Sequence, residues 1–235
     1  MICILLLSIL APFHPAEKSP KNARDIARAM EAHYHRAVTL KAHFVEKYSD
    51  GNGGVSAESG TVYFSKPGRM RWEYESPEEK LFIVDGANVW FYIPADRTAS
   101  RAKIGASSDW RTPLAFLTGK SDFDRLCRSM QIVDAANAGK GSFDDRPANS
   151  GDTLLRCAPR ASSDAPEQQI SEVLLEADSE DRLVRVVIRQ PGKLETEFRF
   201  GGWEENLPIS ETKFHFVPPP GVAVVDESTL AGALH

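Results

Sequence analysis

Hydrophobic and polar residues alternate strictly in the stretch 69–75. Apolar side chains stand at the even positions and charged side chains at the odd positions. Because successive side chains of a β-strand point to opposite faces, this pattern predicts a strand with one apolar face and one wet face. The pair Ser76-Pro77 ends the strand, and the tight-turn pair Asp85-Gly86 separates two further apolar runs, so we expect two hairpins in series. The apolar residues concerned are Met70, Trp72 and Tyr74, then 81–84 and 89–93.

The same period of two recurs along most of the chain. It is strictest near residue 197, where Glu195 and Glu197 alternate with Phe198 and Phe200 and are expected to face water. Many strands, short turns and one-sided alternation indicate an antiparallel sheet curled around its own apolar face. Such a sheet either packs a solid core or encloses a cavity, and the period does not distinguish the two. Further strands are expected at residues 40–44, 62–64, 97–104, 154–158, 173–177, 183–188, 194–200 and 212–217.

Two helices are expected beside these strands. Ser19-Pro20 is typical of an N-cap followed by proline at the first helical position, and apolar residues then recur at helical spacing as far as Ala37. Residues 112–118 predict a short capped helix with little polar content. The polar interval 134–152, rich in Asn, Gly, Ser and Asp, predicts a surface loop.

The first eleven residues are almost wholly apolar and too short to span a membrane as an ordinary helix. They are similar to the apolar part of a secretory leader, so residues 1–16 are expected to form a signal segment and residues 19–235 the mature domain. No cysteine follows the apolar stretch where a lipid anchor needs one, and the mature protein is expected to be soluble. Its remaining cysteines, Cys127 and Cys157, either form a disulfide in an oxidising compartment or are two separately buried thiols.

Length and charge narrow the classes of function. The chain has 235 residues, of which 42% are hydrophobic, and this is ample for a core. Its formal net charge of −5 argues against nucleic-acid binding, because neutralisation of phosphates needs a basic surface.

No motif supports catalysis or metal binding. The chain has neither a G-x-S-x-G nucleophile elbow nor a glycine-rich phosphate loop, and an S-x-x-K match at Ser210 lacks its companion motifs. His33 and His35 are two residues apart and would point to different sides of a helix, whereas two ligands of one metal must converge. The acidic pairs lie in no ligand loop of known spacing. We therefore expect no enzyme activity, no metal site and no cofactor.

Several segments occur in an order that resembles a known family. A strand ending in a basic residue and proline precedes a strand with tryptophan, an Asp-Gly turn, an aromatic strand and a proline-rich exit. These segments are 60–72, Pro77, 84–86, 89–92 with Pro94, and 213–226. Together they resemble the periplasmic outer-membrane lipoprotein carrier proteins of the LolA type, over nearly the whole mature chain.

The resemblance implies a mainly β, single-domain fold, an unclosed antiparallel barrel that short helices cover as a lid around a hydrophobic cavity. The cavity would take the acyl chains of lipoproteins. An ATP-driven extractor in the inner membrane would supply this cargo, and a receptor in the outer membrane would accept it. The carrier would be a periplasmic monomer without catalytic residues. Residues 21–37 and 114–117 would be lid elements.

Residue roles are implied at a few positions. Lys66 stands where well-known members have an arginine tied to lid closure and cargo release, and a lysine offers a point charge rather than a planar fork. Arg69 and Met70 follow it, and Met70 stands where those members have a bulky apolar residue near the cavity mouth. One-sided strand aromatics either line a cavity or fill a solid core. The residues expected to line the cavity are Phe44, Phe64, Met70, Trp72, Tyr74, Trp90, Tyr92, Phe116 and Leu117.

Two other functions are open from the sequence. A lipid-sensing or lipoprotein-sensing regulatory domain could use the same scaffold. An esterase acting on lipids is disfavoured by the missing nucleophile elbow.

Overall fold

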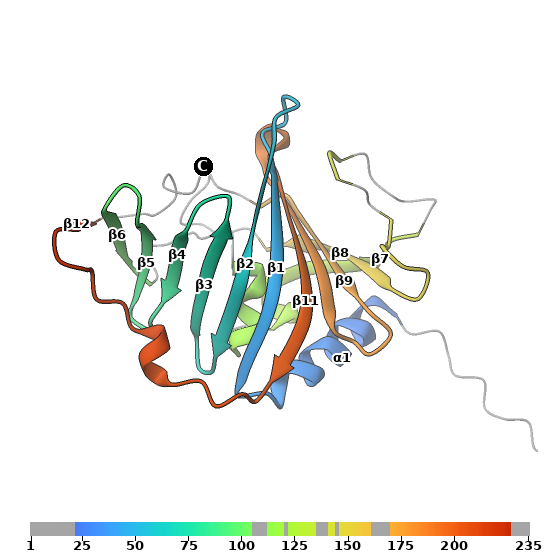
Figure 1. Cartoon of the computed structure of the whole chain (residues 1–235). Helices are drawn as coiled ribbons and strands as arrows, with labels where there is room; N and C mark the ends of the chain where they lie inside the picture. Colours follow the sequence, from blue (N-terminus) through green and yellow to red (C-terminus); the bar gives the residue numbers. More distant parts are fainter. Residues whose placement is uncertain are drawn as a thin grey trace, which may run out of the picture.

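The computed structural model describes residues 22–104, 112–119, 122–134, 141–143, 146–160 and 170–226. They form one mixed sheet of twelve strands with a few short helices (Figure 1). Neighbouring strands are antiparallel except β12 and β6, which are parallel. In order across the sheet the strands are β12 (Ala223–Asp226), β6 (Thr98–Lys103), β5 (Asn88–Ile93), β4 (Lys80–Val84), β3 (Arg69–Ser76), β2 (Val55–Ser65), β1 (Thr39–Ser49), β11 (Glu195–Glu205), β10 (Leu183–Arg189), β9 (Glu172–Ala177), β8 (Thr153–Pro159) and β7 (Cys127–Ile132).

The sheet consists of two runs of consecutive strands. Strands β1 to β6 lie side by side in chain order, and so do strands β7 to β11. Strand β1 joins the two runs, because it pairs with β2 along one edge and with β11 along the other. Phe44 and Phe200, far apart in the sequence, are therefore direct neighbours across the central strand pair.

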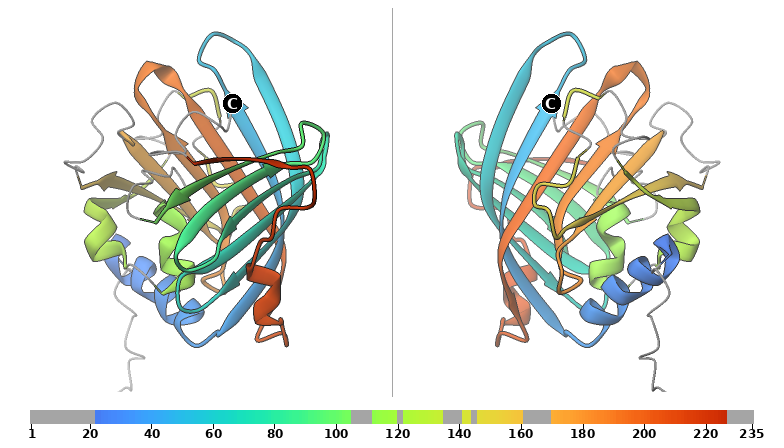
Figure 2. Two further views of the ribbon diagram at one scale, coloured as in Figure 1. Left: turned by 90° about the vertical axis from the view of Figure 1, so that its left-hand side faces the viewer. Right: turned by 90° about the vertical axis from the view of Figure 1, so that its right-hand side faces the viewer.

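Helices α1 (Ala23–His35), η1 (Thr112–Thr118) and α2 (Phe123–Leu126) pack on one side of the sheet (Figure 2). We call this side, which carries Phe44, Trp72 and Phe198, the helix-covered face. The short helix expected at residues 112–118 is confirmed as the 3₁₀ helix η1.

Helix α1 begins at Ala23, not at Pro20 as expected. Asn22 is its N-cap: the Asn22 side chain accepts a hydrogen bond from the Asp25 N–H at 3.0 Å, and the Asp25 carboxylate accepts one from the Asn22 N–H at 3.4 Å. This capping box satisfies two N–H groups that a helix start would otherwise leave unpaired. The expected cap, Ser19-Pro20, lies outside the described residues.

Trp72 occupies the centre of the core. The side chain is fully buried, and its ring meets those of Phe44 and Phe198 at centroid distances of 4.8 and 5.3 Å. These edge-to-face contacts suit the ring quadrupoles. Met30 and Tyr34 of α1 are buried in the same cluster. Because burying one large apolar side chain contributes roughly 1.5–3 kcal/mol, this cluster fixes α1 on the sheet.

A strand was expected at residues 212–217, and this expectation is wrong. Residues Glu211–Phe214 form a 3₁₀ helix, η4, within a segment that crosses the other face of the sheet before β12. We call residues 207–222 the C-terminal strap. It is held through Lys213, whose carbonyl accepts from Arg71 Nη1 at 3.1 Å and whose ammonium lies 4.0 Å from the ring centroid of Tyr63. Contacts to side chains thus replace the ladder pairing of a strand.

Glu195 and Glu197 were expected to face water, but both are buried. The described parts of the interval 134–152 lie over them: the backbone N–H groups of Ser142 and Phe143 donate to Glu195 at 2.8 and 3.1 Å. Glu197 accepts from Arg185 at 3.3 Å. The polar face of β11 is therefore buried, because a chain segment covers it and supplies hydrogen-bond donors to its carboxylates.

A disulfide joins β7 and β8, and β7 itself was not expected from the sequence. Cys127 and Cys157 are bonded, with their Cα atoms 5.5 Å apart, which is an ordinary separation for a cystine. Of the two alternatives for these cysteines, the structure has the disulfide.

Candidate functional site

Seven of the nine residues predicted to line a cavity lie on the helix-covered face or on the helix that covers it. The register alternates correctly along β1, β2 and β3: Phe64 pairs with Met70, and Val62 pairs with Trp72. All seven are buried in one apolar cluster together with α1. They are Phe44, Phe64, Met70, Trp72, Tyr74, Phe116 and Leu117.

Trp90 and Tyr92 do not belong to this surface, and the expectation that they share a side with Trp72 is wrong. In the register of β3, β4 and β5, Trp72 aligns with Phe82 and Phe91, so the neighbours of Phe91 point the other way. The strap residue Phe216 covers both rings there, at centroid distances of 5.4 Å from Trp90 and 5.2 Å from Tyr92. They are structural parts of the opposite face.

Gly60 allows two of the predicted rings to meet. It lies between Phe44 and Tyr74 in the register, and those two ring centroids are 5.0 Å apart. A Cβ atom at Gly60 would stand 1.9 Å from the Glu73 carbonyl oxygen, so no other residue fits there without a shift of the backbone. The apolar surface is therefore continuous from β1 to β3.

The aromatic surface also includes residues that the sequence analysis did not assign to the site. Phe198 and Phe200 on β11 lie in contact with Trp72. Trp203 packs on Tyr34 of α1 with ring centroids 5.3 Å apart, and its indole N–H donates to the Leu183 carbonyl at 2.8 Å. The strict alternation of β11 was the available signal for Phe198 and Phe200. Trp203 follows Gly201-Gly202, where that period ends.

Lys66 holds the end of α1. Its Nζ donates to the carbonyl oxygens of Tyr34 and His35 at 2.6 and 2.9 Å, at the end of the helix, where the Tyr34 carbonyl also accepts from the Ala37 N–H at 3.1 Å. Burial lowers the pKa of Lys66, while the nearby Glu205 carboxylate opposes that shift. A cation at a helix C-terminus is also favoured by the helix dipole.

The same turn, residues 65–68, also holds η1. The Gly68 N–H donates to the Thr118 carbonyl at 3.1 Å, at the end of that helix. One hairpin turn between β2 and β3 therefore fixes the C-terminal ends of both covering helices.

Two further polar contacts fix the last turn of α1. The Tyr34 hydroxyl accepts from the Leu183 N–H at 2.9 Å, and His33 Nε2 lies 2.8 Å from Glu205 Oε1. Burial raises the pKa of Tyr34, and the Leu183 N–H opposes the rise. Tyr34 is therefore a neutral hydroxyl throughout the physiological range.

Arg69 does not contact the covering helices, although it was predicted to take part in lid or partner contacts. It stands at an odd position of β3, and its guanidinium pairs with Glu211 of η4 at 3.1 Å. Arg69 thus anchors the C-terminal strap on the opposite face. Met70, the next residue, is buried on the helix-covered face and is 8% exposed.

The described side chains form no cluster that suits a metal ion. No group of three or more His, Cys, Asp or Glu side chains among them is placed to hold a metal. The Ser210 hydroxyl accepts from the Thr212 N–H at 3.3 Å as the cap of η4. Among the same residues, no helix has the length and apolar character to cross a membrane.

Comparisons with known proteins agree with the residues that carry the resemblance. The chain is 26% identical over 200 residues to an outer-membrane lipoprotein carrier protein from Nitrosospira multiformis, covering 85% of this chain and 87% of the relative. A protein of the same description from Xylella fastidiosa is 28% identical over 203 residues, covering 86% and 88%. The crystal structure of an uncharacterized conserved protein from Thermus thermophilus matches the fold with a TM-score of 0.52 at 13% identity, covering 87% of this chain and 99% of the other.

The family model of the outer membrane lipoprotein carrier protein LolA matches residues 35–153, which contain Lys66 and strands β1 to β7. This is a family of carriers and not of enzymes. The chain belongs to the LolA family and has the function of an outer-membrane lipoprotein carrier.

Proposed function

We propose that this carrier encloses the acyl chains of its lipoprotein cargo between the helix-covered face and the lid formed by α1 and η1. The observation that carries the proposal is the continuous aromatic surface of β1, β2, β3 and β11, which is covered on one side by short helices rather than by a second sheet. An acyl chain binds wherever apolar area is removed from water, and it needs no directional partner. This surface supplies such area without a catalytic group.

The sheet is proposed to be an unclosed, curled barrel around this surface. Trp72 on β3 and Phe198 on β11 support the curl, because β2 and β1 lie between their strands. In a flat sheet their backbones would be about 14 Å apart, at about 4.8 Å per strand, yet the ring centroids are 5.3 Å apart. The sheet order, with β12 and β7 at its two ends, supports an open rather than a closed barrel.

Release of the cargo is proposed to depend on the contact between Lys66 and α1. The contact uses two hydrogen bonds to carbonyls, so it forms with the lid closed and breaks when α1 moves away. We further propose that cargo comes from an ATP-driven extractor in the inner membrane and passes to a receptor in the outer membrane. The carrier would act as a periplasmic monomer, with residues 1–16 serving as its secretory leader.

Met70→Glu tests the acyl site. If Met70 lines a site that opens for cargo, a carboxylate there should abolish binding of a fluorescent fatty-acyl probe, because a buried charge without a partner is costly. Val45→Glu is the matched control, since Val45 is 41% exposed at an odd position of β1 and should bind as the parent does. Thermal unfolding of both variants shows whether the fold survives.

Undiminished acyl binding by a folded Met70→Glu protein would contradict the proposal. Should that variant fail to fold, mass spectrometry of the parent after gentle isolation from the native compartment decides instead. An acylated peptide supports the carrier, whereas a free lipid as the sole bound molecule would favour the sensing domain.

A further inference from the structure

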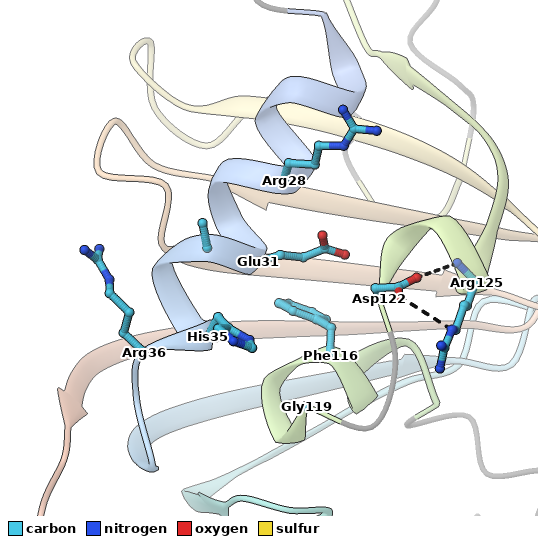
Figure 3. A pocket seen from close by; sticks show the side chains of 9 residues that line it. Arg28, Glu31, His35, Arg36, Phe116, Gly119, Asp122 and Arg125 are labelled. Carbon is cyan, nitrogen blue, oxygen red and sulfur yellow. Dashed lines mark hydrogen bonds and ion pairs between the residues drawn. The ribbon is translucent and has the colours of Figure 1, made fainter.

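A hollow of about 850 Å³ lies between α1 on one side and the helices η1 and α2 on the other (Figure 3). Its rim includes the exposed residues Arg28 and Ala32 of α1 and Arg36, the C-cap of that helix, so it opens to solvent. Its volume falls within the range of about 300–1,000 Å³ that is typical of small-molecule sites. It lies on the solvent side of α1, whereas the acyl surface lies on the sheet side, and Phe116 of η1 belongs to both linings.

Charges of both signs line the hollow. Arg28, His35 and Arg36 project from α1, and Arg125 projects from α2 across the gap (Figure 3). The carboxylates of Glu31 and Asp122 and the ring of Phe116 also line it. The site therefore suits neither a plain anion nor a plain cation, since each would meet like charges as well as opposite ones.

The acidic part of the hollow is held in place by backbone groups. The Phe123 N–H donates to the Glu31 carboxylate, and the Arg125 N–H donates to Asp122 Oδ1 at 2.8 Å. Burial raises the pKa of Glu31, and the neighbouring Asp122 and Asp124 carboxylates add to the rise. A cationic group beside Glu31 would therefore relieve unfavourable charge.

The basic side chains of the hollow have fewer hydrogen-bond and ion-pair partners than the acidic ones. The side chains of His35 and Arg36 form no hydrogen bond or ion pair with any residue that the structure describes. Arg28 is 65% exposed and lies 3.8 Å from Asp124. One guanidinium group can donate two parallel hydrogen bonds to two oxygens of a phosphate or a carboxylate. Its planar shape matches these two groups well.

We propose that this hollow binds the zwitterionic headgroup of an ethanolamine phospholipid. The phosphate diester lies against His35 and Arg36, and the ammonium lies beside the Glu31 carboxylate. Glu31 and His35 are four residues apart on α1, or about 6 Å along the helix axis, and the two-carbon spacer of ethanolamine bridges such a gap. The site goes beyond cargo binding, since it brings the lid itself into contact with a membrane lipid.

The test uses glycerophosphoethanolamine, the headgroup without acyl chains, which has no apolar part for the acyl surface. Titrated into the isotopically labelled full chain, it should shift the backbone amide signals of Glu31, His35, Arg36 and Gly119. Ethanolamine alone and glycerophosphoglycerol alone should bind more weakly, because each satisfies only one half of the site. Shifts confined to other parts of the protein, or no shifts at all, would overturn the assignment.

Charge-neutralising variants then separate the two halves. Glu31→Gln retains the acceptor for the Phe123 N–H, and Arg36 is exposed, so neither Glu31→Gln nor Arg36→Gln should disturb folding. Each should raise the dissociation constant about two- to fivefold, as loss of an exposed ion pair does. Arg128→Gln is the matched control, because Arg128 is exposed on neighbouring β7 and does not line the hollow. If glycerophosphoglycerol binds as tightly as glycerophosphoethanolamine, and if Glu31→Gln does not change this binding, the hollow is an anion site. That result would refute the proposed zwitterion site.

The acyl-probe assay on the same samples keeps this inference apart from the proposed function. Acyl binding without amide shifts at the hollow refutes the headgroup site alone. Amide shifts at the hollow without acyl binding refute the acyl-carrying role and support the headgroup site.

Discussion

At the scale of single residues, the position of one charged atom decides what a side chain does. Lys66 and Arg69 are three residues apart and were both expected at the lid, but the β2–β3 turn sends them to different partners. Lys66 reaches the carbonyls at the end of α1, while Arg69 pairs with Glu211 on the opposite face. Asp85 shows the same dependence on local geometry, because its carboxylate fixes the turn between β4 and β5.

Lys66→Leu should loosen α1 with little loss of stability. Two hydrogen bonds to the carbonyls of Tyr34 and His35 disappear, and we expect the free energy of unfolding to fall by about 1 kcal/mol. Hydrogen exchange should accelerate in the last turn of α1, and transfer of cargo to a receptor should slow. Lys66→Arg is the control, and its hydrogen exchange in α1 and its cargo transfer should match those of the parent protein. Parental transfer by Lys66→Leu would remove this residue from the mechanism.

Asp85→Ala should destabilise the protein in a pH-dependent way. Burial acts to raise the pKa of Asp85, but donors from Asn88, Ala87 and the Trp90 indole lower it below its ordinary value of 3.8. A lowered pKa means that stability is present above pH 3.8 and lost as the pH falls through the folded-state value. We expect about 1–3 kcal/mol less unfolding free energy at pH 7, with the difference shrinking below pH 3.8.

Denaturant titrations at pH 7 and pH 3 measure this dependence. Asp96→Ala is the control, since Asp96 lies exposed in the next turn and its side chain caps nothing among the described residues. A difference between Asp85→Ala and the parent that stays constant with pH would show that the carboxylate charge is irrelevant.

At the scale of elements, the alternation predicted strands well and faces less well. Strands β3, β4 and β5 and the turn at Asp85-Gly86 were predicted from their pattern, because the pattern is local. The face of Trp90 was not, because β5 is apolar on both sides and its register with β4 decides which ring points where. Strand β7 escaped prediction because Cys127–Ile132 is largely exposed and its apolar residues do not alternate.

Removing the disulfide tests how much the link between β7 and β8 contributes to the free energy of unfolding. The bond closes a loop of 30 residues between β7 and β8, and loops of this size are worth about 3–4 kcal/mol in chain-entropy terms. A Cys127→Ala, Cys157→Ala double variant should lose about that much unfolding free energy. Acyl binding should persist, because the aromatic surface lies on β1, β2, β3 and β11. A loss of acyl binding in a folded double variant would mean that the β7 edge shapes the site.

At the scale of the whole molecule, the sequence could not predict which distant segments of the chain cover one another's side chains. The family resemblance and the apolar alternation indicated the helix-covered face and most of its residues. Neither indicated that Ser142 and Phe143 cover Glu195, nor that Phe216 packs on Trp90. Both events join segments far apart in the chain, and periodicity carries no information about them.

The buried charges beneath Arg146 and Ala148 should matter to global stability. Arg185 is 2% exposed and pairs with Glu176 at 2.6 Å and Glu197 at 3.3 Å. Arg185→Met should cost about 3–5 kcal/mol, because it leaves the buried Glu176 carboxylate without its counter-ion, whereas Glu197 keeps Arg199 at 2.9 Å. Adding Glu176→Gln and Glu197→Gln to that variant should recover part of the loss, as chemical denaturation would measure. A single variant as stable as the parent would show that the cluster is not coupled to the fold.

The joining of two strand runs at β1 and β11 has a consequence for the time course of folding. Within each run, strands pair with their neighbours in the sequence, so these pairings close shorter loops than the seam does and can form earlier. The seam between the runs pairs Leu40 with Glu205, so it closes only after nearly the whole chain has been synthesised. Until then β1 presents an open edge, which invites pairing with other chains. Nascent protein should therefore need shielding of β1 for longer than any other strand, and fragments ending near residue 104 should aggregate.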